Sequence, residues 1–128
     1  MAYSEKFERA VAHVLSQEGG YVKDPDDPGG ETKYGISKRS YPNLNIKGLT
    51  KAQAIEIYHR DWWERYRYEE IEPSLLATKV FSFAVNMGAS RAHKLLQQAV
   101  NMTREERSLV LDGIIGIRTI EAIYSHDC

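Results

Sequence analysis

Apolar side chains recur at every third or fourth position along most of the chain, and this spacing predicts amphipathic helices. The first predicted helix runs from an N-cap at Ser4 to a stop at Gly19 and Gly20. Further helices are predicted to begin at Thr50, Ser74, Ser90 and Thr103, the last of these ending near Leu111, and a short final helix covers residues 118–124. A chain of 128 residues suits one core, so we expect a mainly α single domain of about six helices.

A long loop between residues 21 and 40, rich in proline and glycine, interrupts the helical pattern. A loop of this length in a compact domain is either mobile or functional. A short β-hairpin around residues 32–36 is the one regular element that its sequence suggests.

The charge balance argues against one class of function. The 17 basic and 18 acidic residues give a net charge of −1, which removes the bulk electrostatic case for a nucleic-acid partner. Some basic residues gather late in the chain, and we expect them to form a solvated helix face. These residues are Arg91, Lys94, Arg104 and Arg107.

Cysteine and histidine usage argues against a metal or cofactor. The one cysteine, Cys128, is the last residue, so no internal disulfide can form and a cysteine nucleophile is not credible. The histidines at positions 13, 59, 93 and 126 lack metal-ligand spacing, and no glycine-rich phosphate loop follows a predicted strand. We therefore expect no metal and no cofactor.

The first nine residues lack the apolar segment of a signal peptide, and no apolar run approaches the length of a membrane span. We therefore expect a protein made in the cytoplasm, without an integral membrane segment. We also expect it to be a monomer.

Glu18 continues the apolar stripe of the first predicted helix and is followed at once by two glycines. Partial burial and the negative end of the helix dipole would both raise the pKa of its carboxyl group. A glutamate that stays protonated near neutral pH suits general-acid cleavage of a glycosidic bond. The alternative is a surface glutamate at a helix end, and the pattern alone does not decide between the two.

Three aspartates on the following loop, Asp24, Asp26 and Asp27, are candidates for a second carboxyl group. A separation of about 6.5–9.5 Å between two such groups leaves room for a water molecule and predicts inversion at the sugar carbon. For Asp24 and Asp26, ordinary turn chemistry is the better interpretation. Asp27 is therefore the preferred partner of Glu18.

EGGYVKDPDDPGGETKYGIS, residues 18–37, is the first of three stretches that resemble one known family. It resembles the signature of the glycoside hydrolase family 108 lysozymes, which are N-acetylmuramidases of phages and Gram-negative bacteria. FSFAVNMGASRAHKLLQQAV, residues 81–100, resembles a second family helix, with Ser82 where an aspartate is usual. LDGIIGIRTIEAI, residues 111–123, resembles a segment often described as peptidoglycan-binding, with Ile117 in place of the usual proline.

The resemblance implies a lysozyme-like fold with a long catalytic loop. It divides the chain into a catalytic region, residues 1–100, and a partial C-terminal region, residues 101–128, that resembles a peptidoglycan-binding segment and packs on the same domain. Family members usually continue beyond the point where this chain ends, which implies a shortened C-terminal region. A replaced proline at Ile117 implies a shifted start for the last helix.

The resemblance also assigns roles to individual residues. It implies hydrolysis of the β-1,4 bond between N-acetylmuramic acid and N-acetylglucosamine, with Glu18 as the acid and a peptidoglycan glycan strand as the partner. Asp27 and Thr32 are the candidates for holding the attacking water. Asn86 is a candidate for binding an N-acetyl group, or else a helix C-cap. Tyr34 is a candidate for stacking on a sugar ring, or else an anchor of the loop.

Three aromatic residues of the second predicted helix complete the set of site candidates. Tyr58 and Trp62 fall on the apolar stripe of the second helix and are expected in the core rather than against a ligand. Trp63 lies off this stripe, and either lines the cleft or packs against a neighbouring helix.

Two functional alternatives stay open. One is a non-enzymatic wall-binding or secretion-assisting protein on the same scaffold, against which the intact EGGY sequence argues. The other is chitin or chitosan as the substrate. The lack of a signal peptide suits an endolysin that reaches periplasmic peptidoglycan through a holin pore.

Overall fold

The computed structural model describes residues 3–17, 20–26, 30–102 and 109–126. Its long helices are α1 (Glu5–Gln17), α2 (Lys51–Tyr58), α3 (Ser74–Met87), α4 (Ala89–Met102) and α5 (Ile117–His126). A π-helix, η1 (His59–Glu64), continues α2, and a short 3-10 helix, η2 (Tyr68–Glu70), follows it. Three short strands, β1 (Val22–Lys23), β2 (Glu31–Lys33) and β3 (Ile36–Ser37), form an antiparallel sheet in that order. The mainly α architecture is confirmed, and so is the short hairpin.

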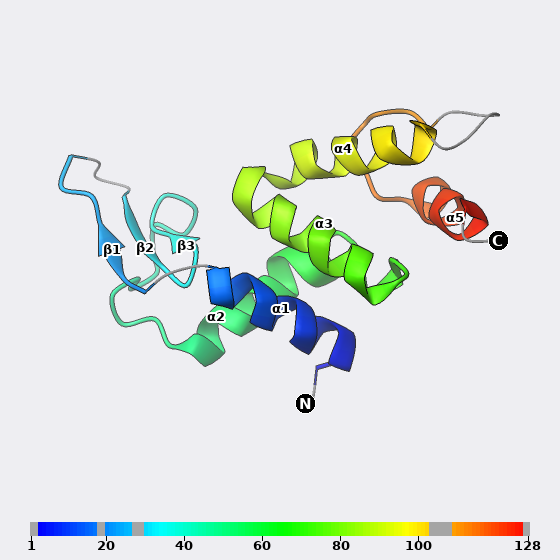
Figure 1. The fold of residues 1–128 in the computed structure, drawn as a ribbon. Coiled ribbons are helices and arrows are strands. Elements are labelled where there is room, and N and C mark those ends of the chain that lie inside the picture. The colour runs from blue at the N-terminus through cyan, green and yellow to red at the C-terminus, as the bar shows by residue number, and fades with distance from the viewer. Residues whose placement is uncertain (1–2, 18–19, 27–29, 103–108, 127–128) are drawn as a thin grey trace.

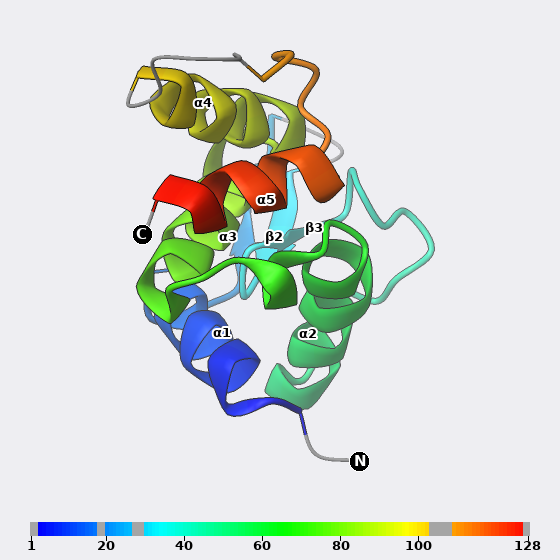
Figure 2. The same cartoon turned by 90° about the vertical axis from the view of Figure 1, so that its right-hand side faces the viewer.

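The helices and the sheet occupy different parts of the molecule. Figure 1 shows the sheet at one end, α1, α2 and α3 in the middle, and α4 with α5 at the other end. In the view turned by 90°, α1 and α3 again lie side by side, and α5 packs beneath α4 (Figure 2). None of the helices in the described ranges is long and apolar enough to cross a membrane.

Local signals set the starts of two helices. The Ser4 hydroxyl accepts a hydrogen bond from the backbone N–H of Phe7 at 3.0 Å, as an N-cap does. Thr50 and Gln53 form a complete capping box at the start of α2. Both features match the sequence prediction, because capping depends on residues only three positions apart.

The core is built around an aromatic cluster between α1, η1 and α3. The Trp63 side chain is 1% exposed, and its ring centroid lies 5.4 Å from that of Phe7 and 5.6 Å from that of Phe81. Tyr58 and Tyr68 are also fully buried. Aromatic pairs at these separations add stabilisation beyond the area that they bury.

The π-helix explains why Trp63 is buried. An α-helical period from Tyr58 predicts Trp62 as the next core residue, but in the structure Trp62 is only half-buried. A π-turn adds one residue to the α-helical turn, so position 63 takes the place that position 62 would have. Of the two alternatives for Trp63, the structure therefore supports packing against neighbouring helices.

The segment from residue 109 to residue 126 is attached to α4 by a row of polar side chains. His93, Gln97 and Asn101 are four residues apart and so lie on one side of the helix. The Asn101 amide donates to the carbonyl of Leu109 and accepts from its N–H. Residues 103–108 of the predicted fifth helix lie outside the described residues. Its remaining residues, 109–111, are not helical, and the backbone N–H and carbonyl of Leu109 bond to the Asn101 amide instead.

His93 is buried between two fixed partners. Its Nδ1 lies 2.9 Å from the carbonyl oxygen of Gly113, and its Nε2 lies 2.6 Å from the hydroxyl of Tyr68. A carbonyl can only accept, so Nδ1 carries the proton and Nε2 accepts from Tyr68. Burial lowers the pKa of His93, and the hydrogen bond to Gly113 offsets part of that effect. The imidazole therefore acts as a neutral structural bridge.

Gln97 is the centre of this row. Its side chain is 1% exposed, and its amide oxygen accepts from the N–H of Gly113 at 3.0 Å. Its amide nitrogen lies 3.1 Å from Asp112 Oδ1, 3.0 Å from the carbonyl oxygen of Ile114 and 3.2 Å from Thr119 Oγ1. One glutamine thus satisfies groups from the turn at residues 112–114 and from the first turn of α5.

We expect Gln97→Leu to lower the free energy of unfolding by at least about 2 kcal/mol, because each buried polar group left without a partner costs about 1–3 kcal/mol. Urea denaturation followed by circular dichroism measures this loss. Gln98→Leu is the matched control, because Gln98 is exposed, and its effect should stay within about 0.5 kcal/mol. Equal losses in both variants would contradict the role of Gln97.

Candidate functional site

The end of α1 packs directly against α3. The Ser82 hydroxyl, which is buried, donates a hydrogen bond to the side-chain oxygen of Gln17 at 3.0 Å. Gln17 is the last residue of α1 and precedes Glu18 in the chain. Glu18 itself lies outside the described residues, so its role stays a prediction. Position 82, where the family that the sequence resembles usually has an aspartate, therefore lies next to the end of α1, which precedes Glu18 in the chain.

Sequence reasoning did not predict the contact between Gln17 and Ser82. The signal for it is the polar residue at position 82 within an otherwise apolar stripe of α3. A buried hydroxyl needs a hydrogen-bond partner, and the end of α1 supplies one.

The sheet places Thr32 at its centre. Thr32 lies on the middle strand, where it pairs with Val22 on β1 and with Ser37 on β3. Successive side chains of a strand point to opposite faces, so Thr32 lies on the face opposite Lys33 and its partner Ile36. Ile36 is buried and attaches that other face to the core. The half-buried Thr32 is thereby directed away from the face that Ile36 occupies.

The β2–β3 turn positions Tyr34. Tyr34 and Gly35 have φ values of 54° and 80°, the positive pair that a two-residue type I′ hairpin turn requires. The hydroxyl of the buried Tyr58 donates to the backbone carbonyl of Tyr34 at 2.7 Å. The Tyr34 ring is half-buried against the core. These contacts support an anchoring role for Tyr34, while stacking on a sugar stays a prediction.

The loop between β1 and β2 carries the aspartates. The backbone N–H of Asp24 meets the carbonyl of Gly30 at 3.4 Å and closes this loop. Asp24 Oδ1 accepts from the backbone N–H of Asp26 at 3.0 Å, which is the turn chemistry expected of an aspartate here. Asp27 lies outside the described residues, so its pairing with Glu18 stays a prediction.

A tyrosine links the first residues after α1 to the middle strand. The hydroxyl of Tyr21 donates to Glu31 Oε2 at 2.6 Å. This hydrogen bond is the largest cause of a raised pKa of Tyr21, since it stabilises the protonated phenol. Tyr21 follows the EGG sequence directly. This contact therefore holds the residue after EGG beside β2, the strand that carries Thr32.

Asn86 lies in the last turn of α3 and is exposed. The C-cap of this helix is Gly88, whose φ of 98° is in the region that favours glycine. Asn86 is thus two positions before the cap and does not itself terminate the helix. Its side chain is accessible one helical turn after Ser82 on α3. Its role in binding substrate stays a prediction.

The described residues contain no group of three His, Cys, Asp or Glu side chains that could hold a metal ion. The predicted site residues lie in or next to the end of α1, the three-stranded sheet and the last two turns of α3. In sequence these elements carry the glutamates Glu18 and Glu31, the aspartate-rich loop, Thr32 and the exposed amides of Gln17 and Asn86. Carboxyl, hydroxyl and amide groups of this kind suit acid–base chemistry on a polar substrate.

Comparisons with known proteins identify relatives of this arrangement. A sequence profile described as glycosyl hydrolase 108 matches residues 11–88. Among solved structures, the chain is similar to that of Brucella abortus SagA, with 33% sequence identity and a TM-score of 0.74. That similarity covers 93% of this chain and 68% of the SagA chain. None of the curated proteins matches the sequence. The profile spans the end of α1, the sheet and all of α3.

Proposed function

The chain belongs to the glycosyl hydrolase 108 family, and from this premise we propose that it is an N-acetylmuramidase, with Glu18 as the general acid. The family membership makes it a glycoside hydrolase. The bond that we propose is the β-1,4 bond between N-acetylmuramic acid and N-acetylglucosamine in peptidoglycan. The observation that carries the proposal is the profile match across residues 11–88, which contains every proposed catalytic residue.

The surroundings of Glu18 in the chain support its role. Glu18 follows α1, whose Phe7, Ala10, Val11 and Val14 are buried. A carboxyl group at the C-terminal end of such a helix meets the negative end of the helix dipole, which favours its protonated form. A protonated carboxylic acid can deliver a proton to the leaving glycosidic oxygen.

The remaining roles are proposed for residues of the sheet and of α3. Asp27, with Thr32, would orient and activate the attacking water. Tyr34 and Asn86 would contact the glycan, Tyr34 through its ring and Asn86 through its amide. The contact between Ser82 and Gln17 supports the same placement of the site, because it fixes α3 against the end of α1 that leads into Glu18. Residues 101–128 would form the C-terminal, wall-contacting part of the same enzyme, acting on periplasmic peptidoglycan.

Product analysis tests the proposed bond. Purified sacculi are incubated with the protein, the soluble products are reduced with borohydride, and their masses are measured. We expect products that end in reduced N-acetylmuramic acid. Products that end in reduced N-acetylglucosamine, or released peptides without glycan cleavage, would contradict the proposal. Cleavage of chitin or chitosan, without cleavage of sacculi, would show that the substrate is one of these polymers and not peptidoglycan. Binding to sacculi without any cleavage would favour a non-enzymatic wall-binding protein.

A further inference from the structure

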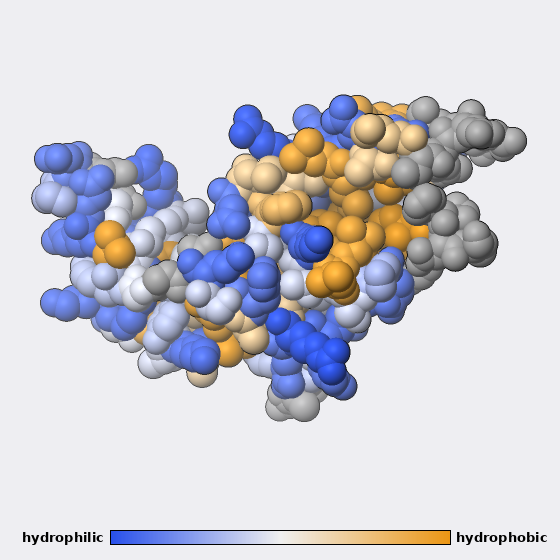
Figure 3. Space-filling model, in the orientation of Figure 1, coloured by the Kyte–Doolittle hydropathy of each residue, from blue (hydrophilic) through white to orange (hydrophobic). Residues whose placement is uncertain are grey.

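Helices α3 and α4 expose large apolar side chains together with basic ones. On α3, Phe83 and Met87 are 49% and 37% exposed, and on α4, Leu95 and Met102 are 46% and 82% exposed. The α3–α4 face consists of these four residues and two exposed basic residues, Lys79 and Arg91. Figure 3 shows apolar surface gathered over these two helices with hydrophilic patches among it. Neighbouring exposed apolar side chains that are bordered by polar residues are typical of an interaction site.

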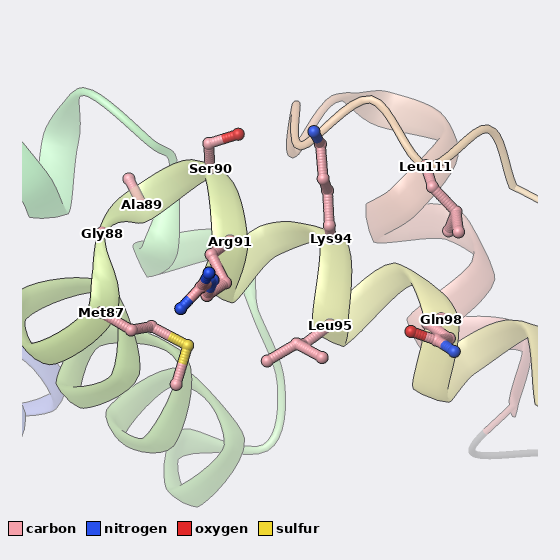
Figure 4. A pocket seen from close by; sticks show the side chains of 9 residues that line it. All are labelled: Met87, Gly88, Ala89, Ser90, Arg91, Lys94, Leu95, Gln98 and Leu111. Atoms are coloured by element: carbon pink, nitrogen blue, oxygen red, sulfur yellow. The ribbon is translucent and has the colours of Figure 1, made fainter.

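The residues of the α3–α4 face form one continuous surface. Lys79, Phe83 and Met87 are spaced by four residues, so they follow one side of α3. Arg91 and Leu95 continue with the same spacing along α4. The two rows meet at a hollow of about 830 Å³, whose lining includes Met87, Arg91 and Leu95. Figure 4 shows these three side chains beside one another along the corner between the helices.

The charge on this part of the chain has one sign. No aspartate or glutamate occurs between Glu72 and Glu105, whereas the same stretch contains Lys79, Arg91, Lys94 and Arg104. Ion pairs between described residues involve none of Lys79, Arg91 and Lys94. Lys94, which also lines the hollow, does interact electrostatically with Asp112. In a chain with a net charge of −1, this asymmetry would turn the α3–α4 face toward an anionic surface.

We propose that the α3–α4 face adsorbs the protein to an anionic phospholipid bilayer. Exposed phenylalanine and leucine side chains can enter the boundary between headgroups and acyl chains, while lysine and arginine bind lipid phosphates. A symmetric contact with a second copy is a poorer fit, because it would bring Lys79 and Arg91 of both copies into one interface, where their like charges repel. The protein lies on the bilayer without spanning it. The proposal does not depend on the muramidase activity.

Vesicle sedimentation of the full chain tests this proposal. The vesicles contain phosphatidylcholine alone or mixed with phosphatidylglycerol, and circular dichroism checks that each variant is folded. The parent should bind the anionic vesicles at least about tenfold more tightly, and high salt should weaken that binding. Lys79→Gln with Arg91→Gln should reduce the binding about tenfold or more, because each basic residue near the bilayer contributes about fivefold.

Matched variants distinguish an effect of the α3–α4 face from an effect of the protein's net charge. Lys47→Gln with Lys51→Gln makes the same change of charge at exposed positions outside the α3–α4 face, and its binding should stay within about twofold of the parent. Phe83→Ser with Leu95→Ser should also reduce vesicle binding. The proposal is overturned if the parent binds both vesicle types equally, or if the control pair loses as much as the face pair. It is also overturned if the serine variant abolishes a dimer seen by light scattering, or if the face variants lose binding to sacculi but not to vesicles.

Discussion

Glu18→Gln is expected to lower the rate of peptidoglycan hydrolysis by about 10²–10⁴-fold, the range that a general acid contributes. Glutamine keeps the size and shape of the side chain but cannot donate a proton to the leaving oxygen. The release of soluble fragments from purified sacculi measures the loss, and circular dichroism should show the same fold for both proteins.

Glu8→Gln is the matched control for this prediction. Glu8 is exposed and lies on α1, the helix that precedes Glu18 in the chain, so its variant makes the same chemical change at a site without a catalytic role. Its rate should stay close to that of the parent. If Glu18→Gln hydrolyses sacculi as fast as Glu8→Gln, Glu18 is not the acid. A second variant, Asp27→Asn, tests the proposed partner, and a small loss would reduce Asp27 to a loop residue.

Trp63→Ala is expected to lower the free energy of unfolding by about 3–5 kcal/mol, as for other large aromatic side chains removed from a core. Trp63 is fully buried, and its ring contacts Phe7, Tyr68 and Phe81. Its indole N–H also donates to Glu69 Oε1 at 2.8 Å, a hydrogen bond that the variant loses. Urea denaturation followed by circular dichroism measures the change.

The neighbouring tryptophan provides the control. Trp62 is only half-buried, so Trp62→Ala should cost clearly less than Trp63→Ala. Trp63→Phe keeps most of the ring and gives a folded variant for comparison in case Trp63→Ala does not fold. A larger loss for Trp62 than for Trp63 would show that the π-helical register is wrong.

Local features of the chain were predictable to within a residue or so. The starts of α1 and α2 follow from Ser4 and from the pair Thr50 and Gln53, because a cap needs only residues three positions apart. The last helix begins at Ile117, one residue before the prediction, and the hairpin falls at the Tyr34–Gly35 pair. The predicted helix that ends near Leu111 is wrong for residues 109–111, its described part. There the Asn101 side chain bonds to the backbone of Leu109, eight positions further along the chain, and the local sequence pattern does not predict such a contact.

The candidate site was predictable in its residues but not in its packing. The EGGY sequence and the aspartate-rich loop are contiguous, so a family signature can be read from them directly. The contact between Ser82 and Gln17 joins residues 65 positions apart. Nothing in the spacing of either segment gives the geometry of such a pair, which depends on how α1 and α3 pack.

By itself, the sequence determined the helical class, the starts of α1 and α2 and the family to which the chain belongs, because these depend on periodicity, capping and contiguous motifs. Only the tertiary structure decided which tryptophan is buried, what Ser82 contacts and how Gln97 holds the segment before α5. The physical reason is that a one-residue change of helix register, or a hydrogen bond between distant elements, is selected by the packing of the whole core. Local sequence preferences differ too little in energy to select it.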